Sequence, residues 1–367
     1  MPRPGSPADH AAWLIMLVLF EGKMRALFSM LFGASLLLFM ERNEAPGRHG
    51  ALLQARRLLW LMLLGYLHFM LLWDGDILFL YGAIGFLALM ARYWSARHLV
   101  LGAALIVTCW QGWGLSIRGG SLGDQAAILS GTASPAAMER QDKDLAWFRT
   151  ADAADNAEAK LPWTGQVRHR LTERAADPLG LVGFNWGETL PWMMLGMALF
   201  KGGFFSGTWQ RRSLVRLAAW GLALGGGATL AFAWWAAKTH YPAVLMHFAL
   251  EFGTVLPHTA MALGYAALLV LGSRALLQSA PGQMLEAAGR MAFTNYIATS
   301  LVMTALCQDW GLGLYGQFGA AQRWTLVFLV WALILAWSQP WLERYRQGPL
   351  EWAWRSLTEW RILDLKR

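Results

Sequence analysis

Apolar residues gather in long runs along the chain, and basic clusters or polar turns separate these runs. A helix needs roughly 17–25 mainly apolar residues to cross a bilayer, and most of the runs approach or reach that length. We predict nine membrane spans, near residues 24–41, 57–73, 76–92, 98–117, 187–206, 213–236, 256–277, 291–310 and 322–342. Two further apolar stretches, residues 11–20 and 242–253, are too short to cross alone. The predicted fold class is all-α, a polytopic transmembrane helical bundle.

The polar segments divide the chain into four predicted parts. These are an N-terminal transmembrane part (1–117), an extracytoplasmic polar segment (118–186), a C-terminal transmembrane part (187–344) and a cytoplasmic amphipathic tail (345–367). Residues 136–176 of the polar segment are expected to form one or two surface helices, with a solvated linker favoured over a lid. The tail mixes tryptophans with charged residues, a pattern typical of a helix that lies in the membrane interface.

Arginine and lysine residues predict the orientation. One set falls on alternate loops and the tail: Arg42, Arg48, Arg56, Arg57, Arg92, Arg97, Lys201, Arg211, Arg212, Arg216, Arg274, Arg290, Arg344, Arg346, Arg355, Arg361, Lys366 and Arg367. The short segments opposite hold Arg3, Lys238 and Arg323. Because basic loops stay in the cytoplasm, we predict a multi-pass membrane protein with a cytoplasmic C-terminus. Nine spans then place the start outside without a signal peptide, so we expect a missing first helix and ten spans in the complete bundle.

The composition agrees with a membrane protein. Hydrophobic residues make up 56% of the chain and charged residues 15%, against roughly a quarter charged in soluble domains. Loop arginines explain the net charge of +8, so we predict a lipid bilayer partner and no nucleic acid. Cys109 and Cys307 have no disulfide or metal spacing. The sequence contains no Gly-rich phosphate loop, G-x-S-x-G or H-E-x-x-H motif, which excludes common soluble-enzyme templates.

The stretch RRLLWLMLLGYLHFMLLWDGDILFLY, residues 56–81, places His68 inside an apolar run that ends on Asp74 and Asp76. An ionisable group at membrane depth is costly, which makes His68 a functional candidate. The alternative is a neutral histidine that hydrogen-bonds between helices.

Three more ionisable residues, Glu21, Lys23 and Arg25, lie at the outer end of the first span. Lys23 and Arg25 could snorkel to the interface, but we favour partners on other helices or on a ligand. Together with Asp74, these groups predict an outward-facing polar cavity.

Two later stretches carry further candidates. In HFALEFGTVLPH, residues 247–258, two histidines and a carboxylate could bind a metal, but the spacing fits no zinc signature, so we predict no metal and expect His258 to line a cavity. In GRMAFTNYIATS, residues 289–300, Arg290 is placed at the cytoplasmic edge, and Asn295 and Tyr296 enter the membrane as candidate substrate-binding residues. Helix packing is the alternative for both polar side chains.

Four motifs in order carry a resemblance to a known family: GKMRALFSMLFGAS, RRLLWLMLLGYLHFMLLWDGDILFLYG, GRMAFTNYIATS and QGPLEWAWRSLT. The chain resembles the YeiB-like bacterial membrane proteins, domain-of-unknown-function family 418, from about Ala11 to Arg361. That family is distantly similar to transmembrane acyltransferases, including the lysosomal heparan-glucosaminide acetyltransferase and bacterial surface-sugar acyltransferases. The family pattern normally begins with a further helix that carries Asp-x-x-Arg-Gly, and this chain departs from the pattern there.

The distant resemblance implies an acyltransferase-like fold and the transfer of an acyl group from acyl-CoA, such as acetyl-CoA, to an envelope sugar or lipid-linked acceptor. It implies that His68 is the base or the acyl carrier, with His10, in its H-x-x-W context, as the competing candidate. It further implies that four residues bind the acceptor or orient the histidine, namely Lys23, Arg25, Asp74 and Asp76. Arg290 would hold a CoA phosphate, and no cofactor is bound tightly. The alternatives are a transporter with an intramembrane substrate or proton path and a non-catalytic scaffold.

Overall fold

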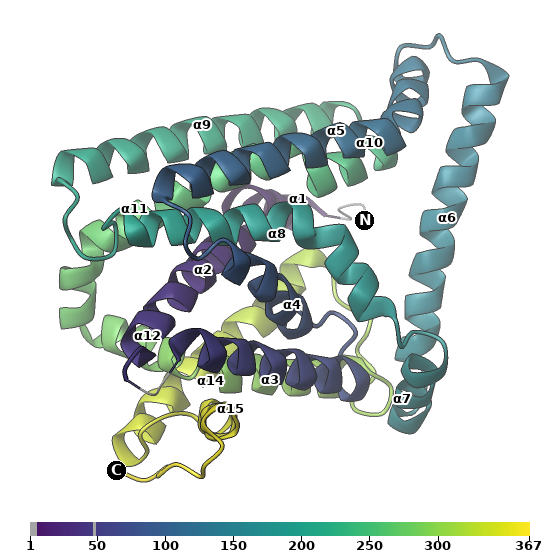
Figure 1. Ribbon diagram of the computed structural model, residues 1–367. Coiled ribbons are helices and arrows are strands. Elements are labelled where there is room, and N and C mark those ends of the chain that lie inside the picture. The colour runs from purple at the N-terminus through teal and green to yellow at the C-terminus, as the bar shows by residue number, and fades with distance from the viewer. Residues whose placement is uncertain (1–5, 47–48) are drawn as a thin grey trace.

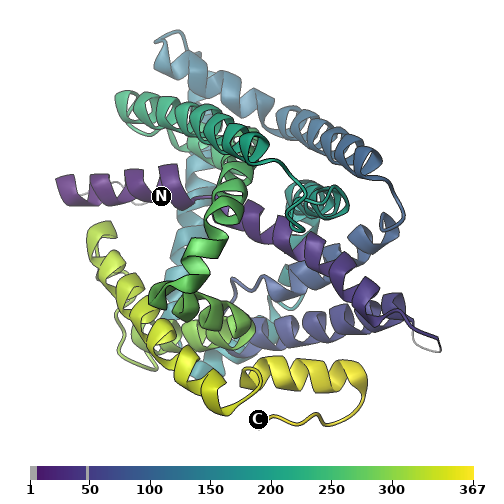
Figure 2. The same ribbon diagram turned by 90° about the vertical axis from the view of Figure 1, so that its left-hand side faces the viewer.

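The computed structural model describes residues 6–46 and 49–367, and this part of the chain folds into helices without a β-strand (Figures 1 and 2). The predicted all-α class is therefore confirmed. Arg3 and Arg48, which contributed to the predicted orientation, lie outside the described residues.

The helices follow one another with short connections. The first seven are α1 (Pro7–Ile15), α2 (Lys23–Asn43), α3 (Gly50–Leu71), α4 (Leu78–Met90), α5 (Ala96–Leu129), α6 (Pro135–Ala159) and α7 (Trp163–Thr172). The others are α8 (Asp177–Lys201), α9 (Arg211–Lys238), α10 (Ala243–Phe248), α11 (Val255–Gln278), α12 (Ala280–Arg290), α13 (Ala292–Cys307), α14 (Ala320–Arg344) and α15 (Pro349–Glu359). Serine hydroxyls begin several of them by accepting a backbone N–H of the first turn, as Ser95 does for α5 and Ser279 does for α12.

Each predicted span coincides with a helix, although the helix ends differ. Four helices, α5, α9, α11 and α14, are long and apolar enough to cross a membrane; whether the others cross stays a prediction. The largest differences are at α5, which continues to Leu129, and α8, which already begins at Asp177. Hydropathy marks the apolar part of a helix only, so it missed these polar extensions.

The two short apolar stretches each form a short helix followed by a π-helical turn. The turns are Met16–Phe20 after α1 and Ala249–Gly253 after α10. Side chains from elsewhere satisfy the backbone carbonyls that these breaks leave free: Tyr265 donates to the Leu19 carbonyl (3.0 Å) and Gln111 to the Phe252 carbonyl. Such compensation is what a broken helix needs in an apolar environment.

The polar segment is not a solvated linker, and that interpretation is wrong. Residues 135–172 form the helices α6 and α7, and α6 runs along one side of the bundle (Figure 1). The indole of Trp163 donates to the Leu71 carbonyl at the end of α3 (2.7 Å). The Arg170 side chain, 2% exposed, pairs with Glu158 (2.7 Å). Since the sequence shows few bulky apolar residues here, it gave no sign that ion pairs would hold the segment in place.

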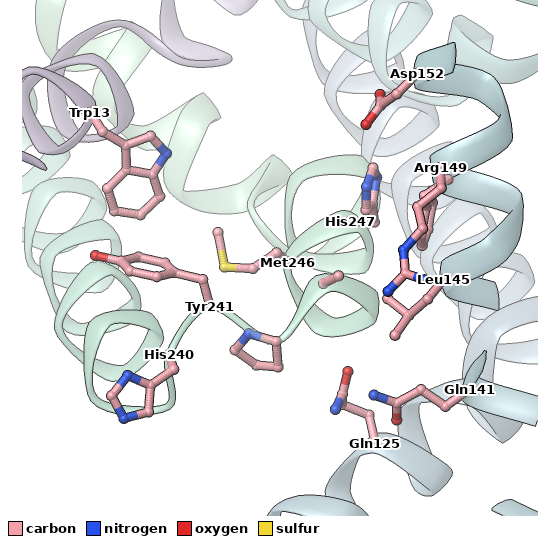
Figure 3. Close-up of a pocket in the computed structure, with 13 residues that line it drawn as sticks. Trp13, Gln125, Gln141, Leu145, Arg149, Asp152, His240, Tyr241, Met246 and His247 are labelled. Atoms are coloured by element: carbon pink, nitrogen blue, oxygen red, sulfur yellow. The ribbon is translucent and has the colours of Figure 1, made fainter. Parts of the chain in front are cut away.

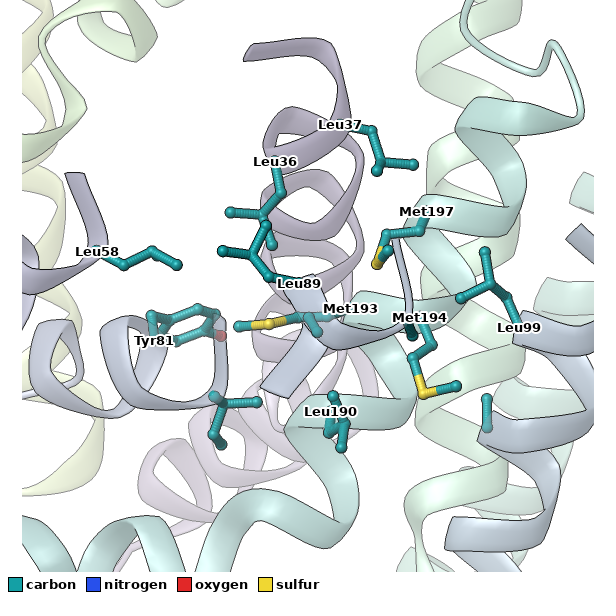
Figure 4. Close-up of a cluster of buried hydrophobic side chains, with 14 of the residues drawn as sticks. Leu36, Leu37, Leu58, Tyr81, Leu89, Leu99, Leu190, Met193, Met194 and Met197 are labelled. Atoms are coloured by element: carbon teal, nitrogen blue, oxygen red, sulfur yellow. The ribbon is translucent and has the colours of Figure 1, made fainter. Parts of the chain in front are cut away.

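The main core lies where α2, α3, α4, α5 and α8 meet. Leucines and methionines from these helices interdigitate there around the ring of Tyr81 (Figure 4). The Tyr81 hydroxyl lies 2.7 Å from that of Ser29, so the phenol can be buried without losing its hydrogen bond.

Glycines set the closest approach between helices. A Cβ atom added at Gly33 of α2 would lie 2.0 Å from the Met193 carbonyl oxygen of α8, and one at Gly196 of α8 would lie 1.8 Å from the Met30 carbonyl oxygen of α2. Small residues that allow such contact are typical of helix packing in membranes, where hydrophobic burial alone drives little association.

The tail helix α15 packs on α3 and α13. The Trp354 indole donates to the Arg57 carbonyl of α3 (2.9 Å), and the Glu351 carboxylate accepts the Phe293 N–H at the start of α13 (2.7 Å). The ring of Trp360, 70% exposed, lies 6.3 Å from that of Trp60. The tail is thus tied to the bundle through polar contacts.

We predict that Gly196→Leu destabilises the protein by at least about 1–3 kcal/mol, because the added side chain must push α2 and α8 apart. The thermal midpoint in detergent measures this loss. Gly227→Leu is the matched control, since Gly227 lies within helix α9 with no neighbouring atom within 4 Å of an added Cβ. Equal midpoints for the two variants would contradict the packing argument.

Candidate functional site

The end of α3 and the start of α4 place His68 and Asp76 together. Helix α3 ends when the N–H groups of Leu72 and Trp73 both bond to the His68 carbonyl (2.9 and 3.1 Å). The chain then turns back, and the Asp76 carboxylate accepts the Phe79 N–H (2.8 Å), which caps the first turn of α4. Asp76 is therefore fixed by its own backbone before it meets His68.

His68 and Asp76 form a buried pair. Nδ1 of His68 lies 2.8 Å from Oδ1 of Asp76, and the two side chains are 1% and 2% exposed. Nε2 of His68 is buried and has no hydrogen-bond partner among the described residues. With an ionised Asp76, which only accepts hydrogen bonds, Nδ1 of His68 carries the proton, and a neutral imidazole then presents its lone pair at Nε2.

Tyr296 of α13 completes this group from the other half of the chain. Its ring centroid lies 5.1 Å from that of His68. The Tyr296 hydroxyl lies 3.5 Å from Oδ1 of Asp76 and accepts the Ile77 N–H (3.3 Å). The ring of Trp73 lies 6.4 Å from His68 on the same helix end. The sequence analysis grouped His68 with Asp76 and singled out Tyr296 separately, and the structure brings all three together.

Asp74 lies elsewhere, although it was predicted as a catalytic partner of His68. Its carboxylate pairs with Arg174 (3.2 Å), which also binds Glu158 and Asp177 (2.7 Å each). Two residues in one turn thus have opposite roles: Asp76 points to the buried histidine, and Asp74 holds the polar segment. Arg174 and Glu158 were missed because their pairing joins distant positions of the polar segment, and spacing along the chain does not reveal such a pair.

Arg25 pairs with an acidic residue that the sequence analysis overlooked. Its guanidinium binds Glu188 of α8 (2.5 Å) and the side-chain oxygen of Asn185 (3.0 Å), and it lies over the Trp192 ring. The Glu188 side chain is only 4% exposed. The sequence did offer one sign of this residue, because the Glu188 carboxylate stands at the edge of the apolar run 187–206.

Lys23 and His258 lie close to this ion pair, on helices α2 and α11. Lys23 is fully buried and donates to the Leu17 carbonyl in the first π-helical turn (2.6 Å). His258 packs against Gly22 so closely that a Cβ there would lie 2.0 Å from Nδ1, and its Nε2 has no partner among the described residues. Asp74 lies apart from these residues, and the shared outer cavity stays a prediction; the Glu21 side chain makes no hydrogen bond or ion pair with the described residues, and its backbone N–H donates to the Met16 carbonyl (2.8 Å).

His247 lines a cavity of ≈ 350 Å³ between α1, α5, α6 and α10 (Figure 3), and His10 lies beside one of the other lining residues, Tyr241. The Tyr241 hydroxyl lies 2.9 Å from Nδ1 of His10. Gln125 and Gln141 line the cavity, and the buried amide oxygen of each has no partner among the described residues. This cavity is separate from His68 and shares no lining residue with the His68 group.

His247 does not join His258 and Glu251 in a metal site. Its ring stacks on Phe148 at 3.9 Å, and the part of the chain that the structure describes holds no group of three metal-ligating side chains.

Asn295 and Arg290 are engaged in packing. The Asn295 amide donates to the Ala288 carbonyl (3.0 Å) and to Ser338 of α14 (3.1 Å), and its oxygen accepts the Trp337 indole (3.0 Å). Arg290 donates to the Arg346 carbonyl (3.3 Å). The geometry gives Asn295 the helix-linking role that was the alternative to substrate binding.

The fold and these buried polar groups define an all-helical protein with apolar helices suited to a lipid bilayer. The chain belongs to the family described as "Protein of unknown function (DUF418)", whose family model matches residues 199–361. It is 30% identical to Uncharacterized protein YxaH of Bacillus subtilis (strain 168), over 96% of this chain and 83% of that protein. It is also 30% identical to Uncharacterized protein YeiB of Escherichia coli (strain K12), over 96% of this chain and 86% of that protein. No solved structure matches the chain.

We predict that the pairing of Glu158 with Arg170 and Arg174 makes stability depend on pH. Burial raises the pKa of Glu158, but hydrogen bonds from Arg174 and Arg170 outweigh it and hold the pKa below the ordinary 4.5. The stabilisation is therefore complete above pH 4.5 and is lost as the pH falls through the lowered pKa. Glu158→Gln should lower the thermal midpoint at pH 7, and the difference from the unmodified protein should shrink in acid.

The control for this measurement is Glu139→Gln on the same helix. Glu139 is 69% exposed and, among the residues that the structure describes, forms its ion pair with Lys143 of its own helix, so removing its charge should change the thermal midpoint little at any pH. A Glu158 effect that is constant with pH would contradict the ion-pair explanation.

Proposed function

We propose that this protein transfers an acyl group from acyl-CoA to an acceptor hydroxyl or amine on an envelope sugar or a lipid-linked molecule. The observation that carries the proposal is the buried His68, held by Asp76 through Nδ1 while Nε2 has no partner. A histidine oriented in this way by a carboxylate is suited to act as a general base. The distant resemblance to transmembrane acyltransferases supplies the reaction class.

In the proposed reaction, Nε2 of His68 takes the proton from the acceptor hydroxyl as its oxygen attacks the thioester carbonyl carbon. The carbon–sulfur bond breaks, and the leaving thiolate receives the proton from the imidazolium to give free CoA. Asp76 keeps the imidazole in the required tautomer and stabilises its charged form. Tyr296 and Trp73 lie against the histidine ring, so a substrate reaches Nε2 when one of these side chains moves.

We expect the purified protein to release free thiol from acetyl-CoA and His68→Ala to lower the rate at least about 100-fold, because general-base catalysis contributes roughly 10²–10⁴. Asp76→Asn should lower it as well by disturbing the tautomer. His98→Ala is the control, since His98 is exposed and bonds only to Ser95 at the start of α5. A well-folded sample that neither binds acetyl-CoA nor releases thiol would exclude acyl transfer.

A transporter is the second candidate, and the Arg25–Glu188 pair favours it. Ionisable residues buried between membrane helices commonly mark substrate or proton paths. Proton-coupled uptake into vesicles that depends on Glu188 but not on His68, together with no acetyl-CoA binding, would support transport in place of acyl transfer.

We further propose that the turn between α3 and α4 faces outside and the C-terminus faces the cytoplasm in the bacterial inner membrane. A reporter fused after Trp73 is expected to lie outside the cytoplasm, and one fused after Arg367 inside it. The reason is that the basic loops lie on the same side of the membrane as the C-terminus, and basic loops stay in the cytoplasm. A cytoplasmic signal after Trp73 would reverse the orientation.

A further inference from the structure

Arg57 of α3 lies in an unusual environment at the opposite end of the helix from His68. Its guanidinium lies between two aromatic rings, 4.8 Å from the Phe39 centroid and 4.3 Å from that of Trp354. Among the described residues, no hydrogen bond or ion pair reaches this guanidinium. A partly buried cation normally has an anionic partner, because removing it from water is costly.

The groove around Arg57 has a volume of ≈ 470 Å³ and lies between the ends of α2 and α3 and the helix α15. Its lining residues include three cations, Arg42, Arg57 and Arg355, and two carboxylates, Glu351 and Glu359. These five residues together carry a formal net charge of +1.

The two carboxylates are already engaged. Glu351 accepts the N–H groups of Phe293 and Thr294, and the Thr294 hydroxyl, at the start of α13. Glu359 lies 3.6 Å from Arg355 and 3.8 Å from Arg361. Arg57 therefore lines the groove without an anionic partner among the described residues. Arg42, which is exposed, lines the rim of the same groove.

Apolar surface lies on another face of α3, more than about 100° round the helix from Arg57, and Arg56 links that face to the groove by donating to the carbonyl of the lining residue Thr358 (3.3 Å). Leu52, Leu59 and Leu63 form an exposed stripe along α3 (58%, 58% and 46%), at spacings that put them on one face with Arg56. The exposed Trp360 lies over Arg56, with 5.7 Å between the guanidinium and the ring centroid. A ligand that joins an anion to hydrocarbon chains fits both surfaces.

We propose that this groove binds the phosphate of an anionic phospholipid, with Arg57 as the principal contact, Arg42 at the rim and the acyl chains along the α3 stripe. Guanidinium groups pair with phosphate through charge-assisted hydrogen bonds, and basic pockets beside membrane helices are suited to lipid headgroups. A soluble phosphate ester shares the phosphate chemistry but leaves the apolar stripe uncovered.

The experiment measures phosphatidylglycerol bound to the detergent-purified protein by native mass spectrometry. Arg57→Gln should lower the affinity of the tightest lipid site about tenfold or more, because a charge-assisted bond is lost. The lipid affinity of Arg57→Lys should lie between those of Arg57→Gln and the unmodified protein, since lysine keeps the charge but not the planar stacking on the aromatic rings. Arg212→Gln removes an exposed charge outside the groove and should bind like the unmodified protein.

Two further measurements keep the outcome decisive. Arg42→Gln changes an exposed rim residue and should weaken lipid binding even if Arg57→Gln fails to fold. Calorimetry with inorganic phosphate and with coenzyme A tests the soluble source. Lipid binding by Arg57→Gln and Arg42→Gln equal to that of Arg212→Gln would overturn the proposal. Binding of coenzyme A that is lost in Arg57→Gln while lipid binding is kept would assign the groove to a soluble phosphate ester instead.

Discussion

Where α2 crosses α8, no side chain separates the two backbones. Gly33 faces the Met193 carbonyl, and Gly196 faces that of Met30. Because the helices meet this closely, Arg25 of α2 can reach Glu188 of α8. Methionines beside the glycines fill the remaining space, since an unbranched side chain adapts to an irregular gap. The positions of α3 and α4, and so of His68, follow from the surface that this crossing presents.

The sequence predicted the helices well because apolar runs and basic loops report directly on a bilayer. It also singled out His68, Asp76 and Tyr296, since ionisable and hydroxyl groups stand out in apolar runs. The resemblance grouped His68 with both Asp74 and Asp76, but it could not tell which of them pairs with the histidine, because that contact forms only through the turn that Asp76 itself helps to shape. Glu188 and Arg170 were missed for a different reason: each depends on a partner from another helix, and spacing along the chain carries no information about such pairs.

Most polar groups in the bundle have partners that remove the cost of burial. Lys23 has a carbonyl, Arg25 a carboxylate and Asn295 two neighbouring helices. Two ionisable groups on α3 differ: like the neutral amide oxygen of Gln54, Nε2 of His68 and the guanidinium of Arg57 each lack a hydrogen-bonding partner among the described residues. They are 11 residues apart, which is about three helical turns and roughly 16 Å along the axis. One helix thus carries an unsatisfied base near one end and an unsatisfied cation toward the other.

The contacts of His68 also differ in how far they reach along the chain, and this bears on the order of assembly. Asp76 is eight residues away in the turn before the next helix, whereas Tyr296 is 220 residues beyond Asp76. Chains fold from the N-terminus as they are synthesised, so the α3–α4 hairpin can form its histidine–carboxylate pair long before α13 exists. During that interval the imidazole is open on the side that Tyr296 later covers. When the C-terminal half folds, Tyr296 therefore covers a His68–Asp76 pair that has already formed. A chain that ends before α13 would carry this pair without the Tyr296 ring over the imidazole.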